Sequence, residues 1–156
     1  MNKKILVLFI FVVIASISTA SAFDLNDLFK GSSANNSTGE DVNISGIGFK
    51  IPKGFKEIND NTDKNRIDNS TFNTTSKAFT NDKNDTIIIS VTTYNTPTND
   101  SWAKDASEGG NKTTINGVEG YTFTSPGFEG FTFSKDGKLV FFEATNKNLL
   151  NEIKVA

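Results

Sequence analysis

Residues 128–145 read FEGFTFSKDGKLVFFEAT and contain the clearest structural signal in the chain. Aromatic and aliphatic side chains fill both halves of it, and Asp136-Gly137 lies between them. Asp-Gly tolerates the positive φ angles of the tight turns whose geometry matches the twist of paired strands. The stretch therefore predicts a β-hairpin with strands at 128–135 and 138–145.

A second hairpin precedes this one, because Asn116-Gly117 joins predicted strands at 112–115 and 118–125. A further strand is predicted at 85–94, where apolar and polar side chains alternate. One face of that strand carries Ile87, Ile89 and Val91, and the other carries Thr86, Ile88, Ser90, Thr92 and Tyr94. Four rings of the aromatic segment fit alternating core positions, namely Tyr121, Phe123, Phe131 and Phe133.

Two short helices are predicted. After a loop at Pro97, Asn99 or Asp100 can cap a helix that ends at Gly109-Gly110. The apolar side of this helix carries Trp102, Ala103 and Ala106. A closing helix is predicted from an apolar stripe of Leu149, Leu150 and Ile153, with Asn146 as its cap.

The remaining segments are less regular. Residues 44–51 have strand character, which Pro52 and Gly54 end. Residues 58–67 are polar and turn-rich, 66–80 show a weak pattern anchored by Phe72 and Phe79, and 81–84 form a turn cluster. Strands joined by tight turns, with one helix between them and one after them, predict an α+β fold. We expect an antiparallel sheet flanked by helices.

The first 22 residues carry the marks of an export signal. Lys3 and Lys4 precede an apolar run, and Ala20-Ser21-Ala22 has the small-residue form that a signal peptidase accepts. We expect a signal peptide at 1–22, a secreted or cell-surface location, and no membrane span after cleavage. The alternative is an N-terminal membrane anchor, although residues 5–22 are slightly shorter than the roughly 20 that span hydrocarbon.

Residues 23–41 differ from the segments on either side of them. Leu25, Leu28 and Phe29 have the spacing of one helical face, so 23–30 reads as a short amphipathic stub. A docking peptide for a partner is the alternative interpretation of the same three side chains. Residues 31–41 contain no aromatic or branched aliphatic side chain, which predicts a flexible linker. The folded domain is accordingly placed at 42–156.

The composition excludes several kinds of site. The chain has no Cys, so it forms no disulfide, thiolate nucleophile, zinc–thiolate site or lipid-modified cysteine. It has no His, so it lacks an imidazole base or ligand and a Ser-His-Asp triad. A net charge of −2 gives no electrostatic case for a nucleic-acid partner. We expect no cofactor and no metal.

Three segments resemble PsbP-like domains, as found in small exported proteins of methanogenic archaea. GFKIPKGF (48–55) is similar to the opening strand of such domains, and TINGVEGY (114–121) is similar to their central hairpin. VFFEATNKNLLNEIKV (140–155) resembles their last strand and C-terminal helix. The resemblance implies an antiparallel sheet flanked by helices and a role in binding. It assigns no functional residue, and the lipid-modified Cys of the lipoprotein members is missing here.

Acidic residues supply the candidates for chemistry. Glu119, Glu129 and Glu143 lie on predicted strands and could converge like the carboxyl pair of a glycosidase, but strands that expose them to water explain them more simply. Two acidic and amide clusters could offer oxygen ligands to Ca²⁺, although neither has the spacing of a calcium loop. These clusters are Asp60, Asp63, Asn65 and Asp68, and Asp82, Asn84 and Asp85. Solvated turns are the preferred interpretation of both.

Two further sets of residues are candidates for the surface of an exported protein. Phe128, beside Pro126-Gly127, can lie on an exposed loop and contact a partner. The Asn-x-Ser/Thr acceptors for glycosylation begin at Asn35, Asn36, Asn43, Asn69, Asn73, Asn84, Asn99 and Asn111. We therefore expect an exported, non-enzymatic module that binds a protein or an envelope component, with a small extracellular carboxylate-dependent hydrolase as the alternative.

Overall fold

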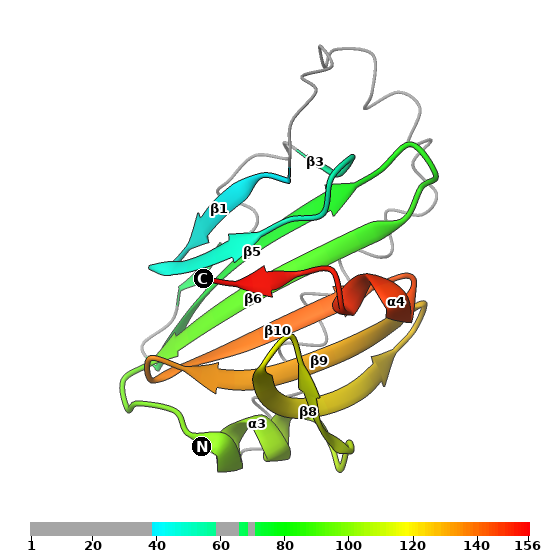
Figure 1. Ribbon diagram of the computed structural model, residues 1–156. Coiled ribbons are helices and arrows are strands. Elements are labelled where there is room, and N and C mark those ends of the chain that lie inside the picture. The colour runs from blue at the N-terminus through cyan, green and yellow to red at the C-terminus, as the bar shows by residue number, and fades with distance from the viewer. Residues whose placement is uncertain (1–38, 59–65, 69–70) are drawn as a thin grey trace. The chain divides into compact units, whose positions relative to one another are not determined.

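The computed structural model describes residues 39–58, 66–68 and 71–156 (Figure 1). Several predictions fall on other residues and so lie outside the described part of the chain. These are the signal peptide at 1–22, the stub with Leu25, Leu28 and Phe29, nearly all of the linker, the sequons at Asn35, Asn36 and Asn69, and Asp60, Asp63 and Asn65. Neither helix in the described part has the length and apolar character needed to cross a membrane.

A large antiparallel sheet organises the domain. Its strands lie in the spatial order β3 (Lys56–Glu57), β5 (Phe72–Thr80), β6 (Thr86–Tyr94), β10 (Lys138–Ala144), β9 (Phe128–Lys135), β8 (Val118–Ser125) and β7 (Lys112–Ile115). A short additional strand, β4 (Arg66–Asp68), pairs with β5. Consecutive hairpins build most of this order, because β5–β6, β7–β8, β8–β9 and β9–β10 are neighbours both in the chain and in the sheet.

The two predicted hairpin turns are confirmed. Asn116 and Gly117 have φ angles of 50° and 81°, and Asp136 and Gly137 have φ angles of 52° and 71°. These positive values are what the tight turns of a twisted hairpin require. The predicted strand at 85–94 is confirmed as β6, with Ile87, Ile89 and Val91 in the core.

A second, three-stranded sheet was not predicted. Residues 44–51 form no single strand, because Ser45-Gly46 turns the chain between β1 (Asp41–Ile44) and β2 (Ile47–Lys50). The φ angles of 50° at Ser45 and 83° at Gly46 match those of the other hairpin turns. The third strand, β11 (Lys154–Val155), comes from the other end of the domain and pairs with β2.

The predicted closing helix is therefore shorter than expected. Asn146 does cap a helix, since its side chain accepts from the Asn148 N–H, but α4 (Lys147–Leu150) has only four residues. Leu149 and Leu150 are buried on α4, whereas Ile153 lies beyond the helix and is buried as the chain enters β11. The extended backbone after α4 supplies a strand to the second sheet in place of another helical turn.

The core lies between one face of the large sheet, which carries Ile87, Ile89 and Phe142 and which we call the first face, and a layer made of the second sheet and α4. This layer lies in front of the large sheet in Figure 1. Phe142 of β10 joins these layers. Its ring centroid lies 5.7 Å from that of Phe49 in β2, 6.4 Å from Phe131 and 5.3 Å from Phe133. A sheet, rather than a helix, thus provides most of the cover on this face.

The other helix, α3 (Asp100–Ala106), packs on the opposite face of the large sheet, which carries Tyr94 and Tyr121 and which we call the second face. Asn99 is its cap, as predicted, and the Asn99 side chain accepts from the Ser101 N–H. The ring of Trp102 lies 4.8 Å from that of Tyr94 on β6, measured between centroids. The architecture is mostly antiparallel β-sheet with two short helices.

Candidate functional site

The second face of the large sheet carries most of the buried polar side chains of the domain. They are Thr74, Ser76, Thr80, Ser90, Thr92, Thr132 and Glu143. The hydroxyls of Thr74 and Thr92 lie 2.9 Å apart, and those of Ser76 and Ser90 lie 2.8 Å apart, which joins β5 to β6. Paired hydroxyls satisfy one another, so this part of the face can be polar and still be stable.

Glu143 is the one buried acid on this face among the described residues, with an exposed fraction of 0%. Its Oε1 accepts a 2.8 Å hydrogen bond from the Ser125 hydroxyl, while its Oε2 has no partner in the described part of the chain. Burial raises the pKa of this carboxyl to about 7, against the smaller opposing effect of the Ser125 bond. The carboxyl is thus largely protonated in mildly acidic solution.

Apolar neighbours explain why Glu143 is so well shielded. In the register of the sheet it lies opposite Ile88 on β6 and Gly130 on β9. A Cβ atom at Gly130 would lie 2.3 Å from the Cζ atom of Phe123, so the Phe123 ring lies directly over this glycine. Phe123 also makes an edge-on contact with Phe141, with 6.0 Å between ring centroids. Glycine is required here because only a bare backbone leaves room for that ring.

The hairpin end next to Glu143 is the exposed part of this region. We call it the β8–β9 tip, meaning Ser125, Pro126, Gly127 and Phe128. Phe128 is the first residue of β9, pairs with Ser125, and is partly exposed beside the exposed Pro126 and Gly127. Since Phe128 and Gly130 alternate onto the same face, the Phe128 side chain is on the face of Glu143. The prediction that Phe128 lies in a loop is therefore wrong in detail, although the ring is partly accessible.

The three candidate glutamates do not converge. Glu119 is exposed and forms a 3.2 Å ion pair with Lys112, as expected for a carboxylate that faces water. Glu129 is partly exposed and alternates onto the face opposite to that of Glu143. Glu119 also lies far from Glu143. It precedes Ser125, the hydrogen-bond partner of Glu143, by six residues on β8, which is about 20 Å at roughly 3.3 Å per residue. No two of these three are placed as a glycosidase pair would be.

The prediction that the Glu143 side chain faces water is wrong, because this side chain is buried. The sequence did offer a signal for this, because Glu143 interrupts the apolar run VFFEA at 140–144. Two other polar atoms on the second face were also missed. The Thr132 hydroxyl and the Tyr94 hydroxyl are buried with no hydrogen-bond partner among the described residues. Burial raises the pKa of the Tyr94 hydroxyl above its ordinary value.

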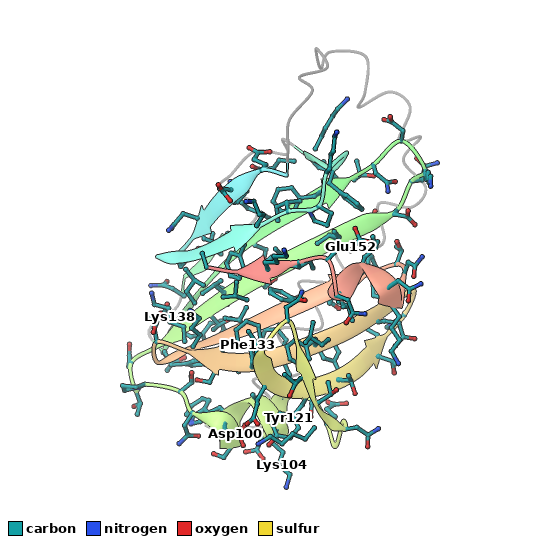
Figure 2. The ribbon with its side chains drawn as sticks, in the orientation of Figure 1. Asp100, Lys104, Tyr121, Phe133, Lys138 and Glu152 are labelled. Atoms are coloured by element: carbon teal, nitrogen blue, oxygen red, sulfur yellow. The ribbon has the colours of Figure 1, made fainter. Side chains whose placement is uncertain are left out.

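A second polar cluster joins α3 to the edge of the sheet. The Tyr121 hydroxyl donates a 2.7 Å hydrogen bond to Asp100 Oδ2, and Figure 2 shows the two residues side by side. That bond raises the pKa of Tyr121. The Lys112 pKa is also raised, chiefly by its hydrogen bond to Glu119. The Tyr121–Asp100 bond joins α3 to β8, and the Lys112–Glu119 pair joins β7 to β8.

The acidic turn at Asp82, Asn84 and Asp85 is a hydrogen-bonded loop, as preferred from the sequence. Asn81 Oδ1 accepts from the N–H groups of Lys83 and Asp85, and Asn81 Nδ2 donates to Asp85 Oδ2 at 3.0 Å. Across the described ranges, no three acidic side chains gather in a way that could hold a metal ion. The turn is therefore explained by its own hydrogen bonds.

The five sequons within the described residues have exposed acceptors, namely Asn43, Asn73, Asn84, Asn99 and Asn111. They occupy different local settings. Asn73 lies on β5, Asn84 has a φ angle of 62° in a turn, and Asn99 caps α3. All five acceptor side chains are therefore accessible, and they differ in the backbone structure that surrounds the asparagine.

The chain matches no family model, no curated protein and no solved structure. Its own geometry therefore has to indicate what it does.

Proposed function

We propose that the chain is exported and acts at or outside the cell surface as a non-enzymatic, PsbP-like binding module. Its partner is a protein or an envelope component, and the β8–β9 tip makes the contact. The lysine-led apolar run and the small-residue site that ends at Ala22 support export. The antiparallel sheet with two short helices is compatible with the fold that the resemblance implies.

The observation that carries the proposal is an accessible aromatic side chain on a firmly held hairpin end. Pro126 is exposed and Phe128 is partly exposed, and Ser125, the last residue of β8, is hydrogen-bonded to the buried Glu143. Breaking this hydrogen bond is costly, because the buried carboxyl of Glu143 would lose its one partner among the described residues. This bond ties the β8 end of the tip to the buried part of the second face. Less conformational entropy is lost when such a surface binds.

Binding explains the residue content better than catalysis does. The chain has no imidazole and no thiol, and its strand glutamates lie apart from one another. Glu143 is enclosed by Ile88, Phe123 and Gly130, which suits an anchor for the tip better than a group that reacts with a substrate. Aromatic residues at a rigid surface are common in the centres of protein interfaces.

Site-specific photocrosslinking in the cells that make the protein tests this proposal. A photoreactive phenylalanine analogue is placed at position 128, and at position 152 as a control, because Glu152 is exposed on the segment after α4 (Figure 2). We expect a reproducible crosslinked species from position 128 that is weak or missing from position 152. Equal products from both positions, or none from either, would contradict a role for the tip.

A pull-down from the native envelope adds a second measurement. Phe128→Ala should reduce capture of the crosslinked partner at least several-fold, and thermal unfolding should confirm that the variant is folded. Capture that is unchanged in a folded Phe128→Ala variant would place the contact elsewhere.

A further inference from the structure

The hairpin of β1 and β2 presents one of the sequons in an unusually open setting. The sequon is Asn43-Ile44-Ser45, at the end of β1. Val42 and Ile44 point into the core, so Asn43 between them points away from it, and it is exposed. Asn43 Oδ1 accepts a 3.0 Å hydrogen bond from the Gly46 N–H. The acceptor side chain is therefore held in one orientation at the surface.

That hydrogen bond leaves the reactive atom of Asn43 accessible. Because Oδ1 is turned toward the Gly46 N–H, Nδ2 lies on the other side of the amide and away from the turn. Across the strand pair, Asn43 lies opposite Gly48, which has no side chain, and the residue next to Gly48 is the small Ala156. Among the described residues, the strand partners of this part of the hairpin thus have small side chains or none next to the Asn43 amide.

The hydroxyl that completes the sequon is accessible too. Ser45 is exposed, and Lys138 Nζ binds the backbone carbonyl of Ser45 rather than its hydroxyl. This contact from β10 steadies the turn and does not involve the Ser45 hydroxyl. The amide of Asn43 and the hydroxyl of Ser45 are thus both presented on a well-held hairpin.

We propose that Asn43 carries an N-linked glycan on the exported protein, which rests on the export that is part of the proposed function. The donor would be a lipid-phosphate-linked glycan at the outer side of the membrane. Asn43 Nδ2 forms a bond to the anomeric carbon of the glycan and loses one proton, while the lipid phosphate leaves with the electron pair of the bond that breaks. No oxidation or reduction is involved. Oδ1 is untouched, so its bond to Gly46 survives the modification.

Two other sequons are set differently from that of Asn43. Asn73 is on β5 between two strands, and it pairs with Asp68 on β4 and Thr93 on β6. At Asn99 the sequon hydroxyl is engaged, because Ser101 Oγ donates a 2.8 Å bond to Asn99 Oδ1. Asn73 thus has a neighbouring strand on each side, and the hydroxyl of the Asn99 sequon is already hydrogen-bonded. Asn73 is therefore a suitable comparison site.

Intact-mass measurement and peptide mapping of the native protein test the proposal. We expect a mature chain that begins at Phe23 and a glycan on the peptide that contains Asn43. Asn43→Asp should abolish that modification completely while it keeps an oxygen that accepts from Gly46. Ser45→Gly should abolish it as well, and glycine suits the φ angle of 50° at this position. Asn73→Asp is the matched control and should leave the glycan in place.

The outcomes separate this inference from the proposed function. An unmodified Asn43 in a protein that begins at Phe23 would overturn the glycan but leave export standing. Glycans at other asparagines with Asn43 unmodified would also overturn it. A chain retained inside the cell with its first 22 residues intact would overturn export and the glycan together. Unfolding midpoints close to that of the parent protein would show that the Asp and Gly variants are folded.

Discussion

At the scale of single residues, Glu143 makes the stability of the domain depend on pH. Its pKa in the folded chain is about 7, and the ordinary value is 4.5, because burial disfavours the charged form. The folded state therefore binds this proton more tightly than the unfolded state does. The contribution to stability is complete below about pH 4.5 and is lost as the pH rises through 7.

We expect the free energy of unfolding to fall by up to about 3 kcal/mol between pH 5 and pH 8, since one pKa unit corresponds to roughly 1.4 kcal/mol. Urea unfolding at a series of pH values measures this slope. Glu143→Gln is the matched variant, because its amide oxygen can still accept from Ser125 while the group does not titrate. The same slope in Glu143→Gln as in the parent would show that another group causes it.

At the scale of elements, the turn between β7 and β8 also holds the C-terminal segment. Asn116 Nδ2 donates to the backbone carbonyls of Asn151 and Ile153, each at 2.7 Å. We expect Asn116→Asp to destabilise the domain by about 1–3 kcal/mol, because a carboxylate tolerates the same φ angle but faces two carbonyl oxygens without a donor. Chemical unfolding gives the magnitude of this effect.

A local readout identifies its cause. Hydrogen exchange in β11 should become faster in Asn116→Asp, since β11 directly follows the segment that Asn116 holds. Asn116→Gly keeps the turn and removes the donors without adding a charge, so it should have a smaller effect of the same kind. Unchanged exchange in β11 for both variants would mean that the two hydrogen bonds do not hold the segment.

The elements that could be predicted from the sequence are those that local chemistry defines. Asn-Gly and Asp-Gly specify their turns within two residues, and Asn99 specifies the start of α3. β5 could not be predicted in the same way. Its buried Thr74 and Ser76 look water-facing until the hydroxyls of Thr92 and Ser90 on β6 are placed next to them. Such pairing is a property of the folded sheet rather than of either strand.

Distance along the chain explains the other differences. β11 is a strand because Lys154 and Val155 pair with Lys50 and Phe49, which lie about a hundred residues earlier. No local pattern in 147–155 indicates that partner, and the apolar stripe by itself predicts a helix. The candidate site shows the same limit. Phe128 could be predicted from its Pro-Gly neighbours, whereas the bond from Ser125 to Glu143 needs β8, β9 and β10 to be aligned.

At the scale of the whole molecule, the aromatic core makes the two sheets one unit. Phe49 is the one aromatic residue of β1, β2 and β11. Its ring contacts that of Phe142 edge-on across the layers, with an interplanar angle of 75°. Both rings are almost fully buried. Loss of either ring therefore leaves a cavity that both sheets line, and neither sheet can keep its part of the core without the other.

We expect Phe49→Ala and Phe142→Ala each to lower the free energy of unfolding by about 3–5 kcal/mol, in one cooperative transition. The single tryptophan of the chain, Trp102, lies on α3 against the other face of the large sheet, so its fluorescence reports a region that Phe49 does not contact. Circular dichroism reports all strands together. In both variants the two signals should change at the same urea concentration, lower than in the parent. A Phe49→Ala variant whose fluorescence transition stays at the parent's midpoint would show that the second sheet unfolds separately from the large one.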